Sequence, residues 1–370
     1  MKGSLEQVPH FGIIGAGAAG GAAAVHLLRL GYRVTVIEAK AFPRAKVCGE
    51  YISPAATDAL EAVLSREELS DAGARRVGTL ALDVGGHSTE WTTRTPGWGL
   101  SRRSLDDLFL NKARALGAGV LQPERVRGVE YLADGVEIAL MSGDLLLVDA
   151  IVHADGSGRH DPAGPVPVDP GVVGHKCHFR VRDAVRGVRI RAGRGAYVGT
   201  IAVEGGIGTC ALVATKSHIA AAGGDADAMM RGLWPEWDAS GREGGWLSCG
   251  VARSRYITPG AERSVRLGNA AGAVDPVGGE GIGNALWSAM AFSELLGGAA
   301  DFSVERLQFA KAGLRRAYRR RLRWRLPACR LGAAVVMRSG LLEMAWPVIG
   351  GRAGWPLIGR PWCRLTGKPV

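Results

Sequence analysis

The segment PRAKVCGEYISP, at residues 43–54, places a thiol directly before a glycine and a carboxylate, Cys48-Gly49-Glu50. A thiol with an ordinary pKa of about 8.5 holds its proton at neutral pH and can deliver it to a substrate atom. The alternative is the commoner fate of a free cysteine, which is to pack as a small hydrophobic side chain. Which role Cys48 has depends on the elements that surround it.

A glycine motif near the start of the chain predicts a nucleotide site. In FGIIGAGAAGGAAAVHLLRLG, the residues Gly15, Gly17 and Gly20 form G-x-G-x-x-G, with Ala18 and Ala19 between the last two glycines. The apolar run before the motif predicts a strand, and the run after it predicts a helix. Glycines at these positions let the chain turn tightly and bring its amides against a pyrophosphate.

An acidic residue at the expected distance, together with the strand, helix and second strand, favours a dinucleotide at this site. The next apolar segment, YRVTVIE, predicts a second strand that ends at Glu38, 18 residues after Gly20. A carboxylate at this position binds ribose hydroxyls and disfavours a ribose that carries a 2′-phosphate.

Three later segments follow in order along the chain. GLSRRSLDDLF, at 99–109, contains an R-x-x-L-D pattern that begins at Arg102 and predicts a helix. IVHADGSGR, at 151–159, is an apolar strand that ends in Asp155-Gly156. SVRLGNAAGAVDPVGGEGIGNALWSAM, at 264–290, is a strand followed by a small-residue turn, a glycine loop and the start of a helix.

With these motifs, residues 10–300 resemble the FAD-dependent oxidoreductases of the aromatic-hydroxylase and geranylgeranyl-reductase superfamily. The resemblance implies that the adenosine half of FAD lies on the glycine motif and Glu38. It places Arg102, or Arg103 in a register shifted by one, near the pyrophosphate or ribityl chain. The family usually has Asp where this chain has Asn269, and an amide accepts a ribityl hydrogen bond without charge, so FAD should still bind, although less tightly. The other implied FAD contacts are Asp155, Gly156, Asp275, Gly279, Gly281 and Ile282.

The cysteine segment resembles the P-R-x-K-x-C-G-E-x-L-S-P version of this superfamily. The resemblance implies that Cys48 and Gly49 lie beside the isoalloxazine ring, with Glu50 just behind. Cys48 could then donate a proton while the flavin delivers a hydride, shape the pocket, or attach covalently to the flavin. Cys48 and Glu50 are the candidate catalytic residues. Lys46 and Arg44 are expected to be solvated loop charges.

Two reactions are compatible with these motifs. The first, which we favour slightly, is hydroxylation of a lipophilic aromatic or polyketide-like substrate through a flavin C4a-hydroperoxide. The second is reduction of isolated or prenyl double bonds, as in geranylgeranyl reductases. A third alternative is a flavin-binding adaptor without turnover. No second nucleotide motif is present, so NAD(P)H is expected to dock transiently, or a separate reductase to supply electrons.

The predicted fold is α/β, with a Rossmann-like FAD-binding domain interleaved with an antiparallel β-sheet substrate domain and a basic helical C-terminal tail. Alternating apolar residues in segments such as KCHFRVR and GTCALVA predict the antiparallel strands. The predicted boundaries are 1–78, 101–170 and 255–325 for the FAD-binding domain, 79–100 and 171–254 for the substrate domain, and 326–370 for the tail.

The positive charge is concentrated near the C-terminus. Of the net charge of +11, residues 306–370 contribute 15 Lys or Arg and one acid, Glu343. KAGLRRAYRRRLRWRLPACR predicts a basic helix that ends near Pro327. Such a helix suits either an anionic membrane surface or a solvated helical cap, whereas nucleic acid binding is disfavoured because no recognised fold accompanies the charge.

The cysteines and histidines predict no metal site. The six cysteines are scattered without a CxxC pair, which favours a reducing compartment. In HKCH, at 175–178, strand alternation sends His175 and His178 to opposite faces. No apolar stretch reaches about 18 residues, the length of a membrane span. We therefore expect a cytoplasmic protein that could associate peripherally with a membrane.

Overall fold

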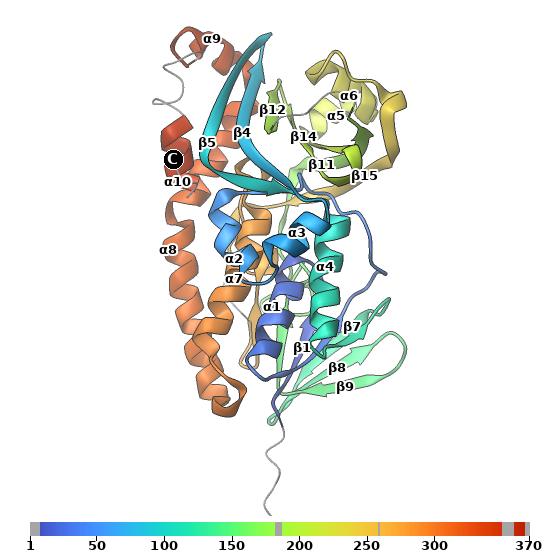
Figure 1. Cartoon of the computed structure of the whole chain (residues 1–370), viewed down its shortest axis with the longest axis vertical. Coiled ribbons are helices and arrows are strands. Elements are labelled where there is room, and N and C mark those ends of the chain that lie inside the picture. Colours follow the sequence, from blue (N-terminus) through green and yellow to red (C-terminus); the bar gives the residue numbers. More distant parts are fainter. Residues whose placement is uncertain (1–7, 182–186, 258–259, 350–358, 367–370) are drawn as a thin grey trace, which may run out of the picture.

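The computed structural model describes residues 8–181, 187–257, 260–349 and 359–366. Within them, two large sheets are joined by a layer of helices, and the second sheet lies beyond the ends of α1 and α4 (Figure 1). The long helix α8 runs along one edge of the molecule (Figure 1).

The first sheet is fully parallel, and its central strand is β1. All five residues of β1, HFGII, are buried, as expected of a strand covered on both faces. β1 pairs with β2 on one side and with β10 on the other. This reversal of strand order is a topological switch point, where the carboxyl ends of the strands leave a crevice. The sheet has the order β17 (Ser264–Arg266), β10 (Ala150–His153), β1 (His10–Ile14), β2 (Arg33–Ile37) and β6 (Gly119–Leu121).

Small residues let the helices beside this sheet pack closely. A Cβ atom on Gly21 of α1 would lie 2.6 Å from the Cβ atom of Phe109 on α4. A Cβ atom on Gly268, at the turn before α7, would lie 2.9 Å from the Cβ atom of Ala19. The helices are α1 (Ala18–Arg29), α2 (Thr57–Glu61), α3 (Arg66–Asp71), α4 (Arg102–Ala115), α5 (Lys216–Ala221), α6 (Ala226–Leu233), α7 (Gly281–Leu296), α8 (Val304–Val336), α9 (Ser339–Ile349) and α10 (Arg360–Thr366).

The second sheet has eight strands and is mostly antiparallel. The one exception among the described strands is the pair of β4 and β12, which is parallel, so the sheet is mixed. Its order is β15 (Arg242–Ala252), β11 (Val168–Arg180), β14 (Ile207–Thr215), β13 (Ala196–Ala202), β12 (Val188–Ala192), β4 (Arg75–Val84), β5 (His87–Gly99) and β3 (Tyr51–Ile52). Two small sheets complete the described strands: β7 (Val126–Tyr131) with β8 (Val136–Leu140) and β9 (Leu145–Val148), and β16 (Arg255–Tyr256) with β18 (Gly272–Ala273).

The sequence predicted that the basic helix would end near Pro327, and this prediction was wrong. Helix α8 continues through Pro327 to Val336. A proline inside a helix removes one hydrogen bond and costs about 3 kcal/mol. Buried residues on both sides of the proline, Leu322 before it and Cys329 after it, hold the helix against the core. Tertiary packing therefore outweighs the local preference.

The predicted fold class is confirmed: a parallel Rossmann-like sheet, a separate β-sheet and a helical C-terminal region are all present. None of the helices in the described part of the chain is both long enough and apolar enough to cross a membrane.

Candidate active site

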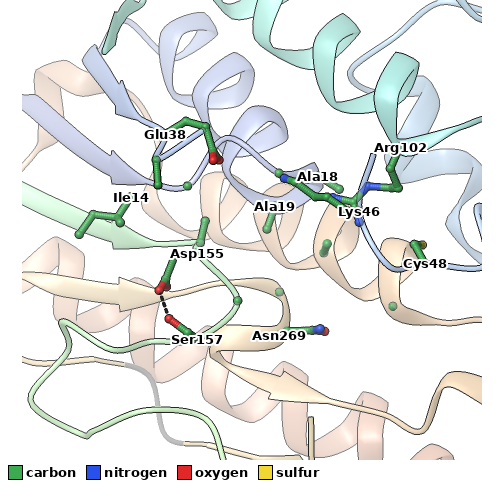
Figure 2. Close-up of a pocket in the computed structure, with 18 of the residues that line it drawn as sticks. Ile14, Ala18, Ala19, Glu38, Lys46, Cys48, Arg102, Asp155, Ser157 and Asn269 are labelled. Carbon is green, nitrogen blue, oxygen red and sulfur yellow. Dashed lines mark hydrogen bonds between the residues drawn. The ribbon is translucent and has the colours of Figure 1, made fainter. Parts of the chain in front are cut away.

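A cavity of about 920 Å³ lies beside the carboxyl ends of β1, β2 and β10. This volume is near the upper end of the range for ligand sites, roughly 300–1,000 Å³. The cavity brings together all the predicted site residues except Gly20 and Asp275 (Figure 2). Those that line it are Gly15, Gly17, Ala18, Ala19, Glu38, Cys48, Gly49, Glu50, Arg102, Asp155, Gly156, Asn269, Gly279, Gly281 and Ile282.

The two exceptions support the cavity from behind. A Cβ atom on Gly20 would lie 1.8 Å from the carbonyl oxygen of Gly15, so Gly20 lets α1 pack against the glycine turn. The Asp275 carboxylate accepts hydrogen bonds from the Val277 amide at 3.1 Å and from the Tyr197 hydroxyl at 3.4 Å. Burial raises the pKa of Asp275. Asp275 therefore shapes the loop that carries Gly279 and turns toward Tyr197, away from the cavity.

The glycine turn and Glu38 form the first end of the cavity. Gly15 has a φ of 96°, a left-handed conformation that favours glycine. The buried Glu38 carboxylate accepts a hydrogen bond of 3.0 Å from the amide of Ala16 within the turn. No side chain caps the start of α1. The free amides at this helix end therefore face a position that suits an anion.

Two cations stand beside this turn. A Cβ atom on Gly17 would lie 3.3 Å from Nη2 of Arg102 and 3.4 Å from Nζ of Lys46. Both cations bind the buried carboxylate of Asp106, Arg102 through Nη2 at 2.7 Å and Lys46 through Nζ at 2.9 Å. One carboxylate balances only one of the two charges. The excess positive charge at the glycine turn fits the pyrophosphate of FAD.

Burial and ion pairing together set the pKa values of Lys46 and Asp106. Burial lowers the pKa of Lys46, although Asp106 opposes the change. Burial alone would raise the pKa of Asp106, but Arg102 and Lys46 outweigh it and lower that pKa. Lys46 was expected to be a solvated loop charge, and that expectation was wrong because its side chain is only 17% exposed. Arg103, the alternative to Arg102, points to solvent.

Cys48 lies at the other end of the cavity from Glu38 (Figure 2). Its sulfur accepts a hydrogen bond of 3.3 Å from the amide of Glu50. The electrostatic influence of Cys48 reaches Arg102: burial disfavours the guanidinium charge, but Asp106 and Cys48 outweigh burial and raise the pKa of Arg102. One backbone donor therefore binds the Cys48 sulfur at the cavity wall, and a cation acts on it electrostatically. Asn269 lies on the wall opposite Lys46 and Arg102 (Figure 2).

Behind Cys48, the carboxylate of Glu50 is fully buried and bound on every side. It accepts hydrogen bonds from the Arg102 amide at 2.7 Å, from Nε2 of His178 at 2.8 Å, from Nζ of Lys176 and from the Thr209 hydroxyl. Burial alone would raise the pKa of Glu50, but His178 and Lys176 lower it from 4.5 to about 2. Glu50 is therefore a fixed anion that joins the cysteine loop, the start of α4 and the second sheet.

Sequence reasoning missed the partners of Glu50. Lys176 and His178 lie on β11, and Thr209 lies on the neighbouring strand β14. Alternation along β11 did indicate that His175 faces away, and its Nδ1 pairs with the Ser248 hydroxyl at 2.7 Å. The same alternation puts Lys176 and His178 on one face, which was the available signal. Among the described residues, no group of His, Cys, Asp and Glu could hold a metal ion.

Comparison with known proteins places this architecture among flavoproteins. No family model matches the chain. A brominase, "flavin-dependent brominase Bmp2", superposes with a TM-score of 0.76 at 18% identity, over 97% of this chain and 93% of its own. PqsL of P. aeruginosa in complex with 2-aminobenzoylacetate gives a TM-score of 0.72 at 20% identity, over 91% and 96%. The chain has the fold of flavin-dependent monooxygenases and halogenases.

The relatives found by sequence include a reductase and a halogenase. The menaquinone reductase of Mycolicibacterium smegmatis is 26% identical over 332 residues, which cover 79% of this chain and 77% of the relative. The flavin-dependent halogenase armH3 of Armillaria mellea is 29% identical over 161 residues, which cover 40% and 32%. The predicted resemblance to FAD-dependent oxidoreductases is thus confirmed at the level of the fold, and the expectations of an enzyme and of an FAD cofactor agree with these relatives.

Proposed function

We propose that this chain is an FAD-dependent reductase that saturates a carbon–carbon double bond of a lipophilic substrate, with Cys48 as the proton donor. The observation that carries the proposal is the position of Cys48 on the cavity wall, where the Glu50 amide donates a hydrogen bond to its sulfur. FAD, when bound and reduced, supplies a hydride. A double bond needs a proton as well, and a thiol is suited to deliver it.

The residues around Cys48 support this step. After Cys48 gives its proton to the substrate carbon, the resulting thiolate accepts the Glu50 N–H bond and faces the Arg102 guanidinium, and both stabilise negative charge. Water then restores the proton of the thiol. NAD(P)H supplies the two electrons and is oxidised to NAD(P)⁺, so the net change in the substrate is the addition of two hydrogen atoms.

The comparisons support reduction of a quinone or isoprenoid substrate. The similarity to a protein named menaquinone reductase extends over 79% of this chain, whereas the similarity to a halogenase covers 40%. Menaquinone is lipophilic and carries a chain with double bonds. The substrate class that we propose is therefore an isoprenoid quinone or a similar prenylated compound.

Hydroxylation, which the sequence slightly favoured, is the second candidate. A structure described as a probable FAD-dependent monooxygenase superposes on 91% of this chain with a TM-score of 0.71. Oxygen transfer to a lipophilic aromatic or polyketide-like substrate would need a cavity that excludes water. Cys48 would then be part of the wall, and its removal would change substrate fit more than the rate of a proton transfer.

The product separates these candidates. The FAD-loaded protein would be incubated with NADPH or NADH and a prenylated quinone, with and without oxygen, and the product analysed by mass spectrometry. Reduction adds two hydrogens, proceeds without oxygen and takes one deuteron from heavy water. Incorporation of one oxygen atom, or a strict need for oxygen, would replace the proposal with hydroxylation. If neither NADPH nor NADH reduces the flavin, even with substrate present, a separate reductase supplies the electrons. If the chemically reduced protein also fails to convert the substrate, the protein is an adaptor without turnover.

The Cys48→Ala variant tests the proton donor. Its turnover should fall by roughly a hundred-fold or more, while reduction of its flavin by NAD(P)H stays normal. Cys249→Ser is the matched control, since Cys249 is an exposed thiol outside the cavity lining. Unchanged turnover of Cys48→Ala would remove Cys48 from the mechanism and leave it as a wall residue.

A further inference from the structure

Helix α8 has two faces of opposite character. Its inner face is buried in the main core through Leu307, Leu314, Tyr318 and Leu322. The outer face carries large apolar side chains that a core would normally cover: Phe309 is 56% exposed, Trp324 59% and Leu331 66%. Residues spaced in this way share one side of an α-helix.

Exposed arginines lie on this face and beside it: at about 100° per residue Arg316, Arg320 and Arg323 share the side of Phe309, whereas Arg315 and Arg319 flank it. All five are exposed and follow closely along the helix. In the part of the chain that the structure describes, no ion pair to a carboxylate is formed by any of these five. Helix α8 itself contains one acid, Glu305 in its first turn.

Other basic residues of α8 have structural partners, which separates them from the outer face. Arg325 binds the buried carboxylate of Glu280 at 3.1 Å, and Arg321 binds the Asn284 side chain at 3.0 Å. Lys311 binds the carbonyl of Ala261. The inward-facing cations therefore serve the fold, whereas the charges of the five outward arginines are not balanced by a carboxylate within the described chain.

From this arrangement we infer that the outer face of α8 binds an anionic membrane surface. Phe309 and Leu331 are 22 positions apart, so this face is about 33 Å long at about 1.5 Å per residue. Tryptophan prefers the boundary between lipid and water, and arginines lie along apolar surface while their charged ends reach phosphate headgroups. Basic and apolar residues on one helical face are the combination that binds in the plane of a membrane surface.

The next helix in the chain, α9, also carries exposed apolar side chains. On α9, Leu341 is 49% exposed and Met344 is 75% exposed. Helix α9 begins three residues after α8 ends and lies at the top of the molecule, beyond the long side along which α8 runs (Figure 1). Exposed apolar side chains therefore occur on α9 as well as on α8.

The outer face of α8 lies close to the cavity. Glu280, which Arg325 holds, stands between the cavity residues Gly279 and Gly281. One helix of about 10 Å diameter thus separates the cavity wall from the outer face of α8. If the substrate is lipophilic, as the proposed function requires, it would have a short path from the bilayer. Membrane binding itself does not depend on the reaction, so the two proposals can fail separately.

Vesicle co-sedimentation of the full FAD-loaded chain tests the inference. We expect binding to vesicles of phosphatidylcholine with phosphatidylglycerol, weaker binding at high salt, and little binding to phosphatidylcholine alone. The triple variant Arg316→Glu, Arg320→Glu and Arg323→Glu should lose roughly ten-fold or more in affinity. The charge-matched control replaces three exposed cations on other elements, Arg33, Arg114 and Lys216, with Glu and should keep its binding apart from a small general charge effect.

A second variant covers the apolar contribution. Trp324→Ala removes one exposed ring without changing charge, and it should weaken vesicle binding while the bound flavin and the turnover of a water-soluble substrate analogue stay normal. Absence of vesicle binding at low salt, or an equal loss in the triple variant and its control, would overturn the inference. Binding of duplex DNA in place of vesicles would also overturn it and would assign the arginines to nucleic acid.

Discussion

The backbone amide of Glu50 donates a 3.3 Å hydrogen bond to the sulfur of Cys48. The side-chain carboxylate of Glu50 is bound by Lys176 and His178 of the second sheet. Glu50 has a φ of 55° and is the one non-glycine residue with positive φ in the part of the chain that the structure describes. Such a conformation costs roughly 1–3 kcal/mol and persists only where the surroundings hold it. The anchors of the carboxylate therefore fix the backbone that presents the thiol.

Glu50→Gln should destabilise the protein strongly. The variant leaves the ammonium of Lys176, whose side chain is 1% exposed, without its carboxylate partner. Loss of one member of a buried ion pair costs about 3–5 kcal/mol. Urea unfolding of both proteins, followed by far-UV circular dichroism, would measure the difference in the free energy of unfolding.

Two further variants separate the buried charge from other effects. Lys176→Met in the Glu50→Gln background removes the unpaired cation and should restore much of the lost stability. Glu61→Gln breaks an ion pair with Arg66, whose side chain is 71% exposed, and should cost less than about 1 kcal/mol. Equal losses of unfolding free energy in Glu50→Gln and Glu61→Gln would show that the buried ion pair contributes no more to stability than the exposed one.

Acid should remove the stability that Glu50 contributes. The carboxyl has a pKa of about 2 in the folded protein and an ordinary value of 4.5 when unfolded. Because the folded-state pKa is depressed, this contribution is complete above the unfolded value and is lost as the pH falls toward the folded value. A shift of this size corresponds to roughly 3 kcal/mol. The difference in unfolding free energy between the parent and Glu50→Gln should therefore become smaller as the pH falls from about 5 to about 2. A difference that stays constant over this pH range would contradict the prediction.

The local parts of this site could be predicted from the sequence. Strand β1, the glycine turn, α1 and β2 are contiguous, so the spacing of Gly15, Gly17 and Gly20 to Glu38 already fixed the arrangement that the structure has. A turn that needs glycine and a strand that ends in an acid are both properties of neighbouring residues. The same reasoning identified the second sheet from alternation.

The surroundings of Glu50 and Lys46 could not be predicted in this way. Glu50 meets Lys176 and Thr209 across 126 and 159 residues of sequence, and these contacts exist only after the two sheets have packed. Lys46 looks like a loop charge until α4 brings Asp106 to it. The path of α8 through Pro327 is likewise decided by burial of residues on both sides, which a local rule for proline does not include.

Lys46→Met should weaken FAD binding by roughly ten-fold or more, because a hydrogen bond to a charged group contributes about 1.5–3 kcal/mol. Lys46 stands beside Gly17 at the turn that suits the pyrophosphate, and Asp106 keeps its partner Arg102 in the variant. Titration of the apoprotein with FAD, followed by quenching of flavin fluorescence, measures the dissociation constant. Lys40→Met is the control, since Lys40 is an exposed lysine of the same segment. Equal affinities of the Lys46 and Lys40 variants would remove Lys46 from the FAD site.

Gly20→Ala should abolish FAD binding or folding, although it adds one methyl group. The new Cβ atom would lie 1.8 Å from the Gly15 carbonyl oxygen, which belongs to the backbone of the glycine turn, so α1 would have to move away from the turn. Gly232→Ala, in α6, is the control. No atom lies within 4 Å of the position that its new methyl group would take, and the φ of Gly232 is not positive. This variant should therefore keep its stability and its bound flavin. Thermal unfolding and flavin absorbance of the two purified variants decide the question. Normal FAD content of Gly20→Ala would show that the close contact between α1 and the glycine turn is not required for the site.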